Sequence, residues 1–328
     1  MAKKITYHFN KELPIIKPDW KGNIAINGQF HNDSKPEKPP VLDVLKWKLS
    51  TNPQKQEKKQ DTFQLPSVPL DFLDTGDKIV WLGHATFLIT INGVNIITDP
   101  CFFDIPTTKR KAVVPCDINV IKNIDYLLLS HDHRDHFDVQ SIRKVFTTNP
   151  KITTLVPLNM KQLLKRNKLN PATIQEAGWY QSYAITKDIA ITFVPAQHWG
   201  RRGLFDFNKT LWGGFLLNYN GKKIYFSGDT AYSPVFKEIN KTFGAIDICI
   251  LPIGAYSPKY IMAESHCTPE EAFQIFNDLE GKTFIPMHYG TYDLSDEPLG
   301  EPIKRIQKCF ENNPSTLKIL SLGEKYIL

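Results

Sequence analysis

One short segment of the chain concentrates the side chains best suited to chemistry. Residues 131–136 read His-Asp-His-Arg-Asp-His and follow an apolar run, Leu127–Leu129, that predicts a strand. A loop after a strand projects its polar side chains into a shared space, and imidazole with carboxylate suits zinc and similar divalent ions. The first two histidines can bind one ion, while Asp135 and His136 can reach a second ion, as a two-metal hydrolytic centre requires. A solvated polar loop is the alternative interpretation.

Three more predicted strands are followed by a side chain that can bind a metal. These side chains are His198, Asp229 and His288. Each one alone is more typical of a cap or a turn than of a ligand. Because all three follow an apolar strand just as segment 131–136 does, they are candidates for the same site.

The strands that must position these residues are predicted from Asp77 onward. Short β-rich runs bounded by turn residues occupy 79–82, 86–91, 95–98, 126–129, 153–156, 189–194, 215–218, 223–226, 246–251 and 283–286. Asn92-Gly93 and Asn220-Gly221 predict hairpin turns between two pairs of these runs, because both residue types tolerate positive φ.

Helices are predicted mainly in the second half of the chain. Residues 268–271, Thr-Pro-Glu-Glu, have the form of a capping box with proline at the first helical position, and apolar residues follow at helical spacing. Ser233 and Asp138 are candidate starts of two further helices. Hairpins followed by strand–helix alternation indicate a layered α+β or α/β fold with mixed sheets.

The first 75 residues differ in composition from the rest. They contain eight prolines and a lysine-rich stretch at 51–61, and proline both fixes φ and removes a backbone donor. We therefore expect residues 1–75 to form an extended arm that packs on the core, with a mobile lysine-rich part and no chemistry of its own. Residues 76–328 are then one folded domain.

The overall composition excludes several classes of protein. With 40 basic and 34 acidic residues among 328, the formal charge is +6, too small and too scattered to predict nucleic-acid binding. No apolar run approaches the ~18 residues that span a bilayer, and the N-terminus lacks the apolar core of a signal peptide. Five widely spaced cysteines without a Cys-x-x-Cys pair predict neither disulfides nor a thiolate zinc site. These features predict a cytoplasmic protein.

Several motifs of the sequence resemble those of the metallo-β-lactamase superfamily. They are His-x-His-x-Asp-His at 131–136, His198, Gly-Asp-Thr at 228–230 and His288, in this order. The short motifs beside them are similar to those of the N-acylphosphatidylethanolamine-hydrolysing phospholipase D group and its bacterial relatives. They include Trp-Leu-Gly-His-Ala-Thr at 81–86, Gln-His-Trp at 197–199 and Trp-Gly-Gly-Phe at 212–215. The resemblance covers about residues 77–292.

The resemblance implies an α+β fold, the αββα four-layer sandwich of the metallo-β-lactamase fold, for residues 76–328. It also implies two divalent metal ions at one edge of the sandwich, zinc in the first place, with manganese and iron as alternatives that suit the same ligands. The residues that match the family's ligands are His131, His133 and His198 for one ion, Asp135, His136 and His288 for the other, and Asp229 between them.

The implied mechanism depends on a metal-bound hydroxide. Two neighbouring cations lower the pKa of a bridging water toward ~7 and stabilise a phosphoryl oxygen as negative charge builds on it. Asp135, as a ligand, would accept the proton of that water. His266, which matches a histidine near the substrate in the family, is a candidate for substrate contact or proton donation. Hydrogen bonding at the start of the following helix is its alternative role.

Residues beside these motifs are expected to support the site or touch the substrate. His84 and Asp99 would orient the ligands. Large aromatic side chains would form an apolar wall or pack in the core, and two arginines could grip a charged head group through paired hydrogen bonds. The candidate substrate contacts are Trp199, Arg201, Arg202 and Trp212.

The sequence therefore predicts a metal-dependent hydrolase, a phosphodiesterase of phospholipase D type acting on N-acylphosphatidylethanolamine-like or related phosphodiesters. Its partner would be a small-molecule or lipid phosphodiester. A lipid substrate would require peripheral contact with a membrane, although the arm shows no evident amphipathic docking helix. A lactonase resembling L-ascorbate-6-phosphate lactonase is the first alternative, because a metal hydroxide also attacks a lactone carbonyl. A non-catalytic metal-binding or sensing module is the second. The sequence does not define the oligomeric state.

Overall fold

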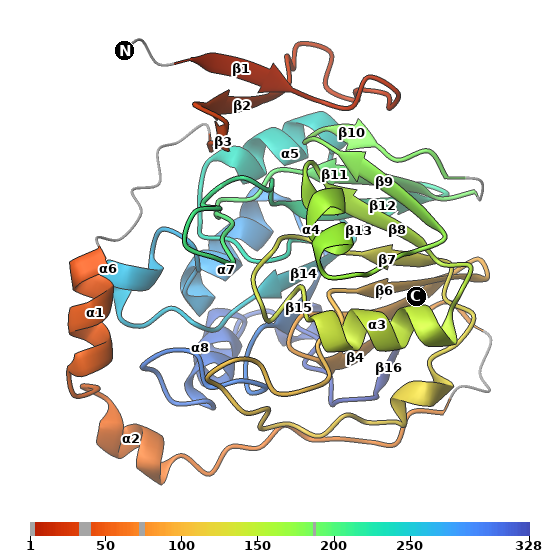
Figure 1. Cartoon of the computed structure of the whole chain (residues 1–328). Helices are drawn as coiled ribbons and strands as arrows, with labels where there is room; N and C mark the ends of the chain where they lie inside the picture. The colour runs from red at the N-terminus through yellow and green to blue at the C-terminus, as the bar shows by residue number, and fades with distance from the viewer. Residues whose placement is uncertain (1–3, 33–40, 72–75, 186–187) are drawn as a thin grey trace.

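Two β-sheets packed face to face form the centre of the molecule, and helices cover both outer faces (Figure 1). The computed structural model describes residues 4–32, 41–71, 76–185 and 188–328. The layers run helix, sheet, sheet and helix, so the predicted α+β sandwich is confirmed.

The larger sheet has seven strands in the order β16-β4-β5-β6-β7-β8-β9. Their bounds are β4 (Lys78–Gly83), β5 (Thr86–Ile91), β6 (Val94–Thr98), β7 (Tyr126–Leu128), β8 (Thr153–Pro157), β9 (Thr173–Ala177) and β16 (Lys325–Ile327). Strands β16, β4, β5 and β6 pair antiparallel, whereas β6 to β9 pair parallel. The C-terminal end of β7 leads directly into segment 131–136.

The smaller sheet has six strands in the order β10-β11-β12-β13-β14-β15. Their bounds are β10 (Gln181–Ser182), β11 (Ala190–Val194), β12 (Gly214–Tyr219), β13 (Lys222–Phe226), β14 (Ile248–Pro252) and β15 (Thr283–Met287). The pairs from β10 to β13 are antiparallel and those from β13 to β15 parallel. Strands β11, β13, β14 and β15 therefore run in the same direction and end at one edge.

Three of the helices begin within two residues of the starts that the capping signals predict, namely Asp138, Ser233 and Thr268. Their bounds are α1 (Val41–Leu49), α2 (Lys55–Gln60), α3 (Val139–Thr148), α4 (Met160–Arg166), α5 (Val235–Phe243), α6 (Lys259–Met262), α7 (Pro269–Asp278) and α8 (Glu301–Cys309), with 3-10 turns at Ile118–Val120 and Pro314–Thr316. The capping box of α7 is confirmed, since Thr268 and Glu271 each bond the other's backbone N–H. Asp138 caps α3 by accepting from Ser141 N. Among the described residues, no helix combines the length and hydrophobicity needed to cross a membrane.

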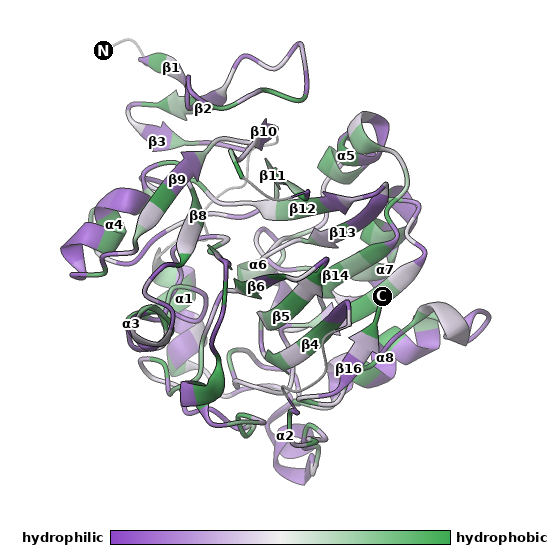
Figure 2. Cartoon of the chain, turned by 90° about the vertical axis from the view of Figure 1, so that its right-hand side faces the viewer, coloured by the Kyte–Doolittle hydropathy of each residue, from purple (hydrophilic) through white to green (hydrophobic). Residues whose placement is uncertain are grey.

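Strand β4 illustrates how apolar residues at successive positions fill both sides of a sheet. Ile79 and Trp81 pack in the core between the sheets, whereas Val80 and Leu82 pack in the core under α3 and α4. Side chains alternate between the two faces of a strand, so a continuous apolar run predicts burial on both. In Figure 2 the hydrophobic colour accordingly concentrates on inner strands such as β4, β5 and β14.

All the predicted strands are present, with ends within two residues of those expected. The two predicted hairpin turns are confirmed as well, with positive φ at Asn92, Gly93, Asn220 and Gly221. Strands β9, β10 and β16 escape prediction because each is a short or partly polar strand near a sheet edge, without an apolar run. Edge strands bury less surface, so their sequences carry a weaker pattern.

The N-terminal arm is more structured than its composition predicts. Strands β1 (Ile5–His8), β2 (Asn23–Ile26) and β3 (Gln29–Phe30) form a separate antiparallel sheet. The expectation of an extended chain is wrong for residues 41–60, where α1 and α2 form between the prolines rather than across them. The lysine-rich stretch is tied to the core through an ion pair between Lys58 and Asp293. The domain boundary after residue 75 stays a prediction and falls beside residues 72–75, outside the described part.

Gly228 is a position where the fold should not accept a side chain. Its φ is +61°, and a Cβ there would lie 2.7 Å from Ser130 Cβ, which belongs to the loop leaving the opposite sheet. We expect Gly228→Ala to lower the free energy of unfolding by roughly 2–4 kcal/mol in urea titrations, because backbone strain and a steric clash add. Gly221→Ala is the matched control, with φ +80° and nothing within 4 Å. It should lose only about 1 kcal/mol, and equal losses in both variants would contradict the clash.

Candidate metal centre

The predicted ligands gather at the edge where strand ends of the two sheets meet. Segment 131–136 follows β7 of the larger sheet, and the other three ligands, His198, Asp229 and His288, follow β11, β13 and β15 of the smaller one. Since β11, β13 and β15 run in the same direction, their C-terminal ends bring these side chains to one place. Topology, not sequence distance, therefore assembles the site.

The first group of ligand atoms comes from three imidazoles and a carboxylate. His131, His133, His198 and Asp229 each offer one atom, and these atoms lie within 4.8 Å of one another. His133 Nδ1 lies 3.0 Å from His131 Nε2 and 3.0 Å from His198 Nε2. Ligands about 2.0 Å from a tetrahedral zinc ion are ~3.3 Å apart. The three ring nitrogens therefore have nearly the spacing of ligands around one cation.

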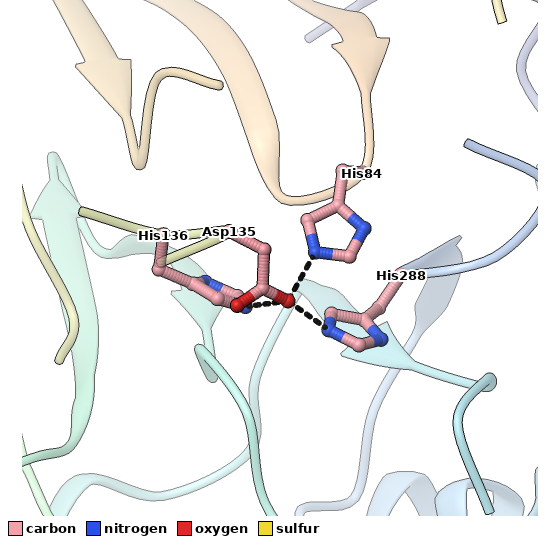
Figure 3. A group of neighbouring side chains, drawn as sticks. All are labelled: His84, Asp135, His136 and His288. Atoms are coloured by element: carbon pink, nitrogen blue, oxygen red, sulfur yellow. Dashed lines mark hydrogen bonds and ion pairs between the residues drawn. The ribbon is translucent and has the colours of Figure 1, made fainter. Parts of the chain in front are cut away.

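The second group surrounds the carboxylate of Asp135 (Figure 3). Asp135 Oδ2 lies 2.9 Å from His84 Nε2, 3.5 Å from His288 Nε2 and 3.7 Å from His136 Nε2. His84 and His288 both have positive φ, +54° and +60°. Such strain in non-glycine residues concentrates at functional sites.

Asp229 lies between the two groups. Its Oδ2 is 3.1 Å from His136 Nε2 and 3.2 Å from His288 Nε2 on one side, and 3.8 Å from His131 Nε2 on the other. This central position is the one expected of a bridging carboxylate. That Asp229 and the six other residues bind metal stays a prediction.

Hydrogen bonds on the far side of the rings decide which nitrogen faces inward. His198 Nδ1 donates to the carbonyl of Ser265 at 2.8 Å, so its Nε2 is free to bind a cation. His136 Nδ1 likewise donates to Asp99 Oδ2 at 2.8 Å, and Asp99 also accepts the backbone N–H of Ser130. Asp99 thus has the contacts expected of a residue that orients a ligand. His84 has a similar contact, because its Nε2 lies within hydrogen-bond distance of Asp135 Oδ2.

Several buried polar atoms of the candidate ligands have no hydrogen-bond partner, and this also fits a site for divalent cations. In the described part of the chain, buried polar atoms without a hydrogen-bond partner include His136 Nε2, His288 Nε2 and Asp229 Oδ1. A buried polar atom that lacks a partner costs free energy, ~1–3 kcal/mol. Several such atoms aimed at one point are explained by a cation that they coordinate.

Burial keeps the histidines of the first group in the neutral form that binds metals. Desolvation, reinforced by neighbouring imidazoles, lowers the pKa of His131 and of His198 well below the usual value for histidine. Desolvation also lowers the pKa of His133, to about 4, against the attraction of Asp135. At neutral pH these three rings are therefore free of the proton that would compete with a cation.

The histidines beside the two carboxylates behave in the opposite way. Burial opposes their charge, but Asp229 and Asp135 raise the pKa of His136 well above its usual value and that of His288 to about 9. Without a cation, protons on these rings supply the positive charge that the buried carboxylates require.

His266 lies at the margin of both groups. Its Nδ1 is 3.9 Å from Asp229 Oδ2, and its side chain lines the cavity that opens over the site. Burial lowers the pKa of His266 to about 4. The ring is therefore neutral at pH 7 and can donate an N–H hydrogen bond to a substrate oxygen.

The four candidate substrate contacts divide into two pairs. Trp199 and Arg201 line the cavity over the site, and the Trp199 ring lies 4.4 Å from that of His133. Arg202 does not line the cavity, and its Nη1 donates to the carbonyls of Asp132 at 2.8 Å and of Phe137 at 2.9 Å. Its guanidinium therefore binds the backbone around segment 131–136, and its expected contact with a head group stays a prediction.

Trp212 is fully buried and does not line the cavity either. Its Nε1 donates to Asn32 Oδ1 at 3.0 Å, and Asn32 Nδ2 donates in turn to the carbonyl of His198 at 2.8 Å. The N-terminal arm thus reaches the backbone of a ligand, a contact that the sequence patterns do not predict.

The sequence also does not predict that the arm forms part of the cavity wall. Val44 and Trp47 of α1 line the same cavity as Asp135 and Asp229. The only signal was the spacing of apolar residues at 41, 42, 44, 45, 47 and 49, which is helical but lies within a proline-rich region. The arm is expected to have no chemistry of its own, and that expectation does not include its contribution to the cavity wall.

Comparison with known proteins agrees with this geometry. A family model described as the beta-lactamase superfamily domain matches residues 94–289. The chain belongs to the metallo-β-lactamase superfamily. The matched residues include all seven predicted ligands, while His84 lies before them.

Two relatives in this superfamily carry the name of one activity. The N-acyl-phosphatidylethanolamine-hydrolyzing phospholipase D 1 of Caenorhabditis elegans is 34% identical over 252 residues, which are 73% of this chain and 71% of that protein. The mitochondrial N-acyl-phosphatidylethanolamine-hydrolyzing phospholipase D of Saccharomyces cerevisiae is 30% identical over 316 residues, which are 93% of this chain and 64% of that protein.

A solved structure supports the fold. A metallo hydrolase of the archaeon Ignicoccus hospitalis superposes with a TM-score of 0.58 at 20% identity, covering 77% of this chain and 99% of its own. With its superfamily membership and its clusters of metal-binding side chains, the protein is a metal-dependent hydrolase.

Metal uptake by the metal-free protein should release protons and strengthen as pH rises. His136 and His288 have raised pKa values, about 9 for His288, so each must lose a proton before it binds a cation. Affinity should therefore rise from pH 6 to pH 8 and fall as acid restores these protons. Calorimetric titration with Zn²⁺ in buffers of different ionisation enthalpy should detect release of about one to two protons per chain. An affinity that stays constant over this range would contradict the assignment.

Proposed function

We propose that the protein is a phosphodiesterase of phospholipase D type that uses two divalent ions, zinc in the first place, on N-acylphosphatidylethanolamine-like or related phosphodiesters. The observation that carries this proposal is Asp229, which lies within 3.8 Å of histidine nitrogens from both ligand groups. Two adjoining cation sites with a shared carboxylate suit attack on a phosphodiester, whose negative charge they can balance. The names of the two relatives support the choice of substrate.

In the proposed site, three residues would hold each ion and one would hold both. His131, His133 and His198 would hold the first ion, Asp135, His136 and His288 the second, and Asp229 both. When bound, the ions supply Lewis acidity that ionises a water near neutral pH and stabilises charge on phosphoryl oxygens.

Asp135 is the proposed proton acceptor. Burial raises its pKa, but the charge of His136 and the close contacts of the His288 and His84 rings outweigh that effect and hold the pKa well below its usual value. The carboxylate is therefore ionised at neutral pH. Its Oδ2 is fixed by the 2.9 Å hydrogen bond from His84 Nε2 and can take the proton of the attacking water.

His266 and Arg201 are the proposed contacts of the phosphate. Both line the cavity, His266 as a neutral ring that can donate an N–H and Arg201 as a fixed positive charge.

The cytoplasmic location of the protein stays a prediction, since the name of the yeast relative assigns that protein to the mitochondrion.

Metal content tests the ligand assignment. The protein should contain close to two equivalents of zinc, manganese or iron by elemental analysis. His288→Ala should lose about one equivalent and most of the activity, because it removes a ligand of one ion only. His8→Ala, an exposed histidine of β1, is the control and should keep both ions. Equal losses in the two variants would show that the ligands are misassigned.

A substrate panel tests the reaction type. We expect hydrolysis of bis-p-nitrophenyl phosphate and of N-acylphosphatidylethanolamine, without cleavage of lactones. Asp135→Asn should reduce turnover by about 10²–10⁴-fold, the usual contribution of general base catalysis together with a weakened ligand. Lactone cleavage without phosphodiester hydrolysis would establish the lactonase alternative instead.

A further inference from the structure

A cavity of about 370 Å³ opens over the two ligand groups. Asp135, Asp229 and His266 form its polar floor, and most of the remaining lining is apolar. A site of this kind suits a ligand with an anionic end and an apolar body. The residues of its walls therefore decide which apolar body fits.

One wall belongs to helix α1 of the N-terminal arm. Val44 and Trp47 are three residues apart, so they lie on the same face of the helix, and both line the cavity. Leu45 is 54% exposed and lies outside the cavity lining. The helix therefore uses one face for the cavity and presents another to solvent.

Another part of the wall comes from the C-terminal half of the chain. Ile261 and Met262 of α6, with Leu294, line the same cavity. Figure 1 shows α1 beside α6 at one side of the molecule. An apolar chain that starts from a phosphate on the floor would therefore contact side chains of both helices.

Side-chain hydrogen bonds fix the position of α1 relative to the floor. Trp47 Nε1 donates to Asp296 Oδ2 at 3.0 Å, and Asn52 Nδ2 donates to the carbonyl of Asp296 at 2.9 Å. Gln54 Nε2 donates to Glu301 Oε2 at 2.8 Å. The arm is thus anchored to the segment that follows His288, and the indole ring has a defined orientation in the cavity.

We propose that α1 is the specificity wall of the site, and that Trp47 limits the length of the apolar chain that a substrate can carry next to its phosphate. The phosphate end of this inference rests on the proposed function, whereas the apolar end rests on the wall alone. Replacing Trp47 by a small residue should admit longer chains, and enlarging Val44 should exclude them.

Binding of n-alkyl phosphates of four, eight, twelve and sixteen carbons to the metal-loaded protein tests the proposal without catalysis. Calorimetry below the micelle concentration should show a gain of up to about fourfold per buried methylene, which stops at a limiting length. Trp47→Ala should move this limit to longer chains, and Val44→Trp should move it to shorter ones. Elemental analysis and thermal unfolding of each variant would verify that the site is intact.

Two controls separate the wall from the anchoring of the helix. Leu45→Ala changes the exposed face of α1 and should leave the limit unchanged. Trp47→Phe keeps a ring in the cavity but removes the hydrogen bond to Asp296, so it should shift the limit less than Trp47→Ala does. A limit that does not move in opposite directions in Trp47→Ala and Val44→Trp would overturn the proposal.

The outcome is distinguishable from a failure of the proposed function. If the alkyl phosphates show the predicted limit but bis-p-nitrophenyl phosphate is not hydrolysed, the wall stands and the phosphodiesterase activity falls. If phosphodiesters are hydrolysed but chain length has no effect on binding or on KM in any of the variants, the activity stands and the wall falls.

Discussion

The site depends on the need to balance two neighbouring carboxylates with positive charge. Asp229 is buried and Asp135 is half-buried among histidines at the base of the cavity, where a carboxylate without a positive partner would be unfavourable. Protonated His136 and His288 can meet part of this need, and divalent cations can meet all of it. The arrangement of strand ends, loops and supporting hydrogen bonds keeps these charges together.

Three turns around the site carry backbone strain that the surrounding structure stabilises. Positive φ at His84, Asp99 and His288 strains the backbone at three turns of the site. Each of these turns directs a side chain to the ligand groups, and the well-packed sheets on either side hold it in place. Arg202 adds to this rigidity by donating to backbone carbonyls of Asp132 and Phe137.

The sequence predicts the inner strands and the hairpin turns, because both depend on local patterns, and the family resemblance adds the set of candidate ligands. Hydrophobic runs define the strands, and polar residues directly after them mark the edge. The role of α1 is beyond such prediction, since its docking depends on Asp296 and Glu301, some 250 positions away. The direction of Arg202 is likewise fixed by carbonyls that no sequence pattern reveals.

The hydrogen bond from Asn32 to the carbonyl of His198 has a consequence for biosynthesis. It joins two segments that are 166 positions apart in the sequence, and the pairing of β16 with β4 spans an even longer stretch of chain. Synthesis runs from the N-terminus to the C-terminus, so a nascent chain that has exposed only segment 131–136 has four of the seven predicted ligands and lacks His198, Asp229 and His288. The two proposed ions would therefore find their full set of ligands only after His288 has been made.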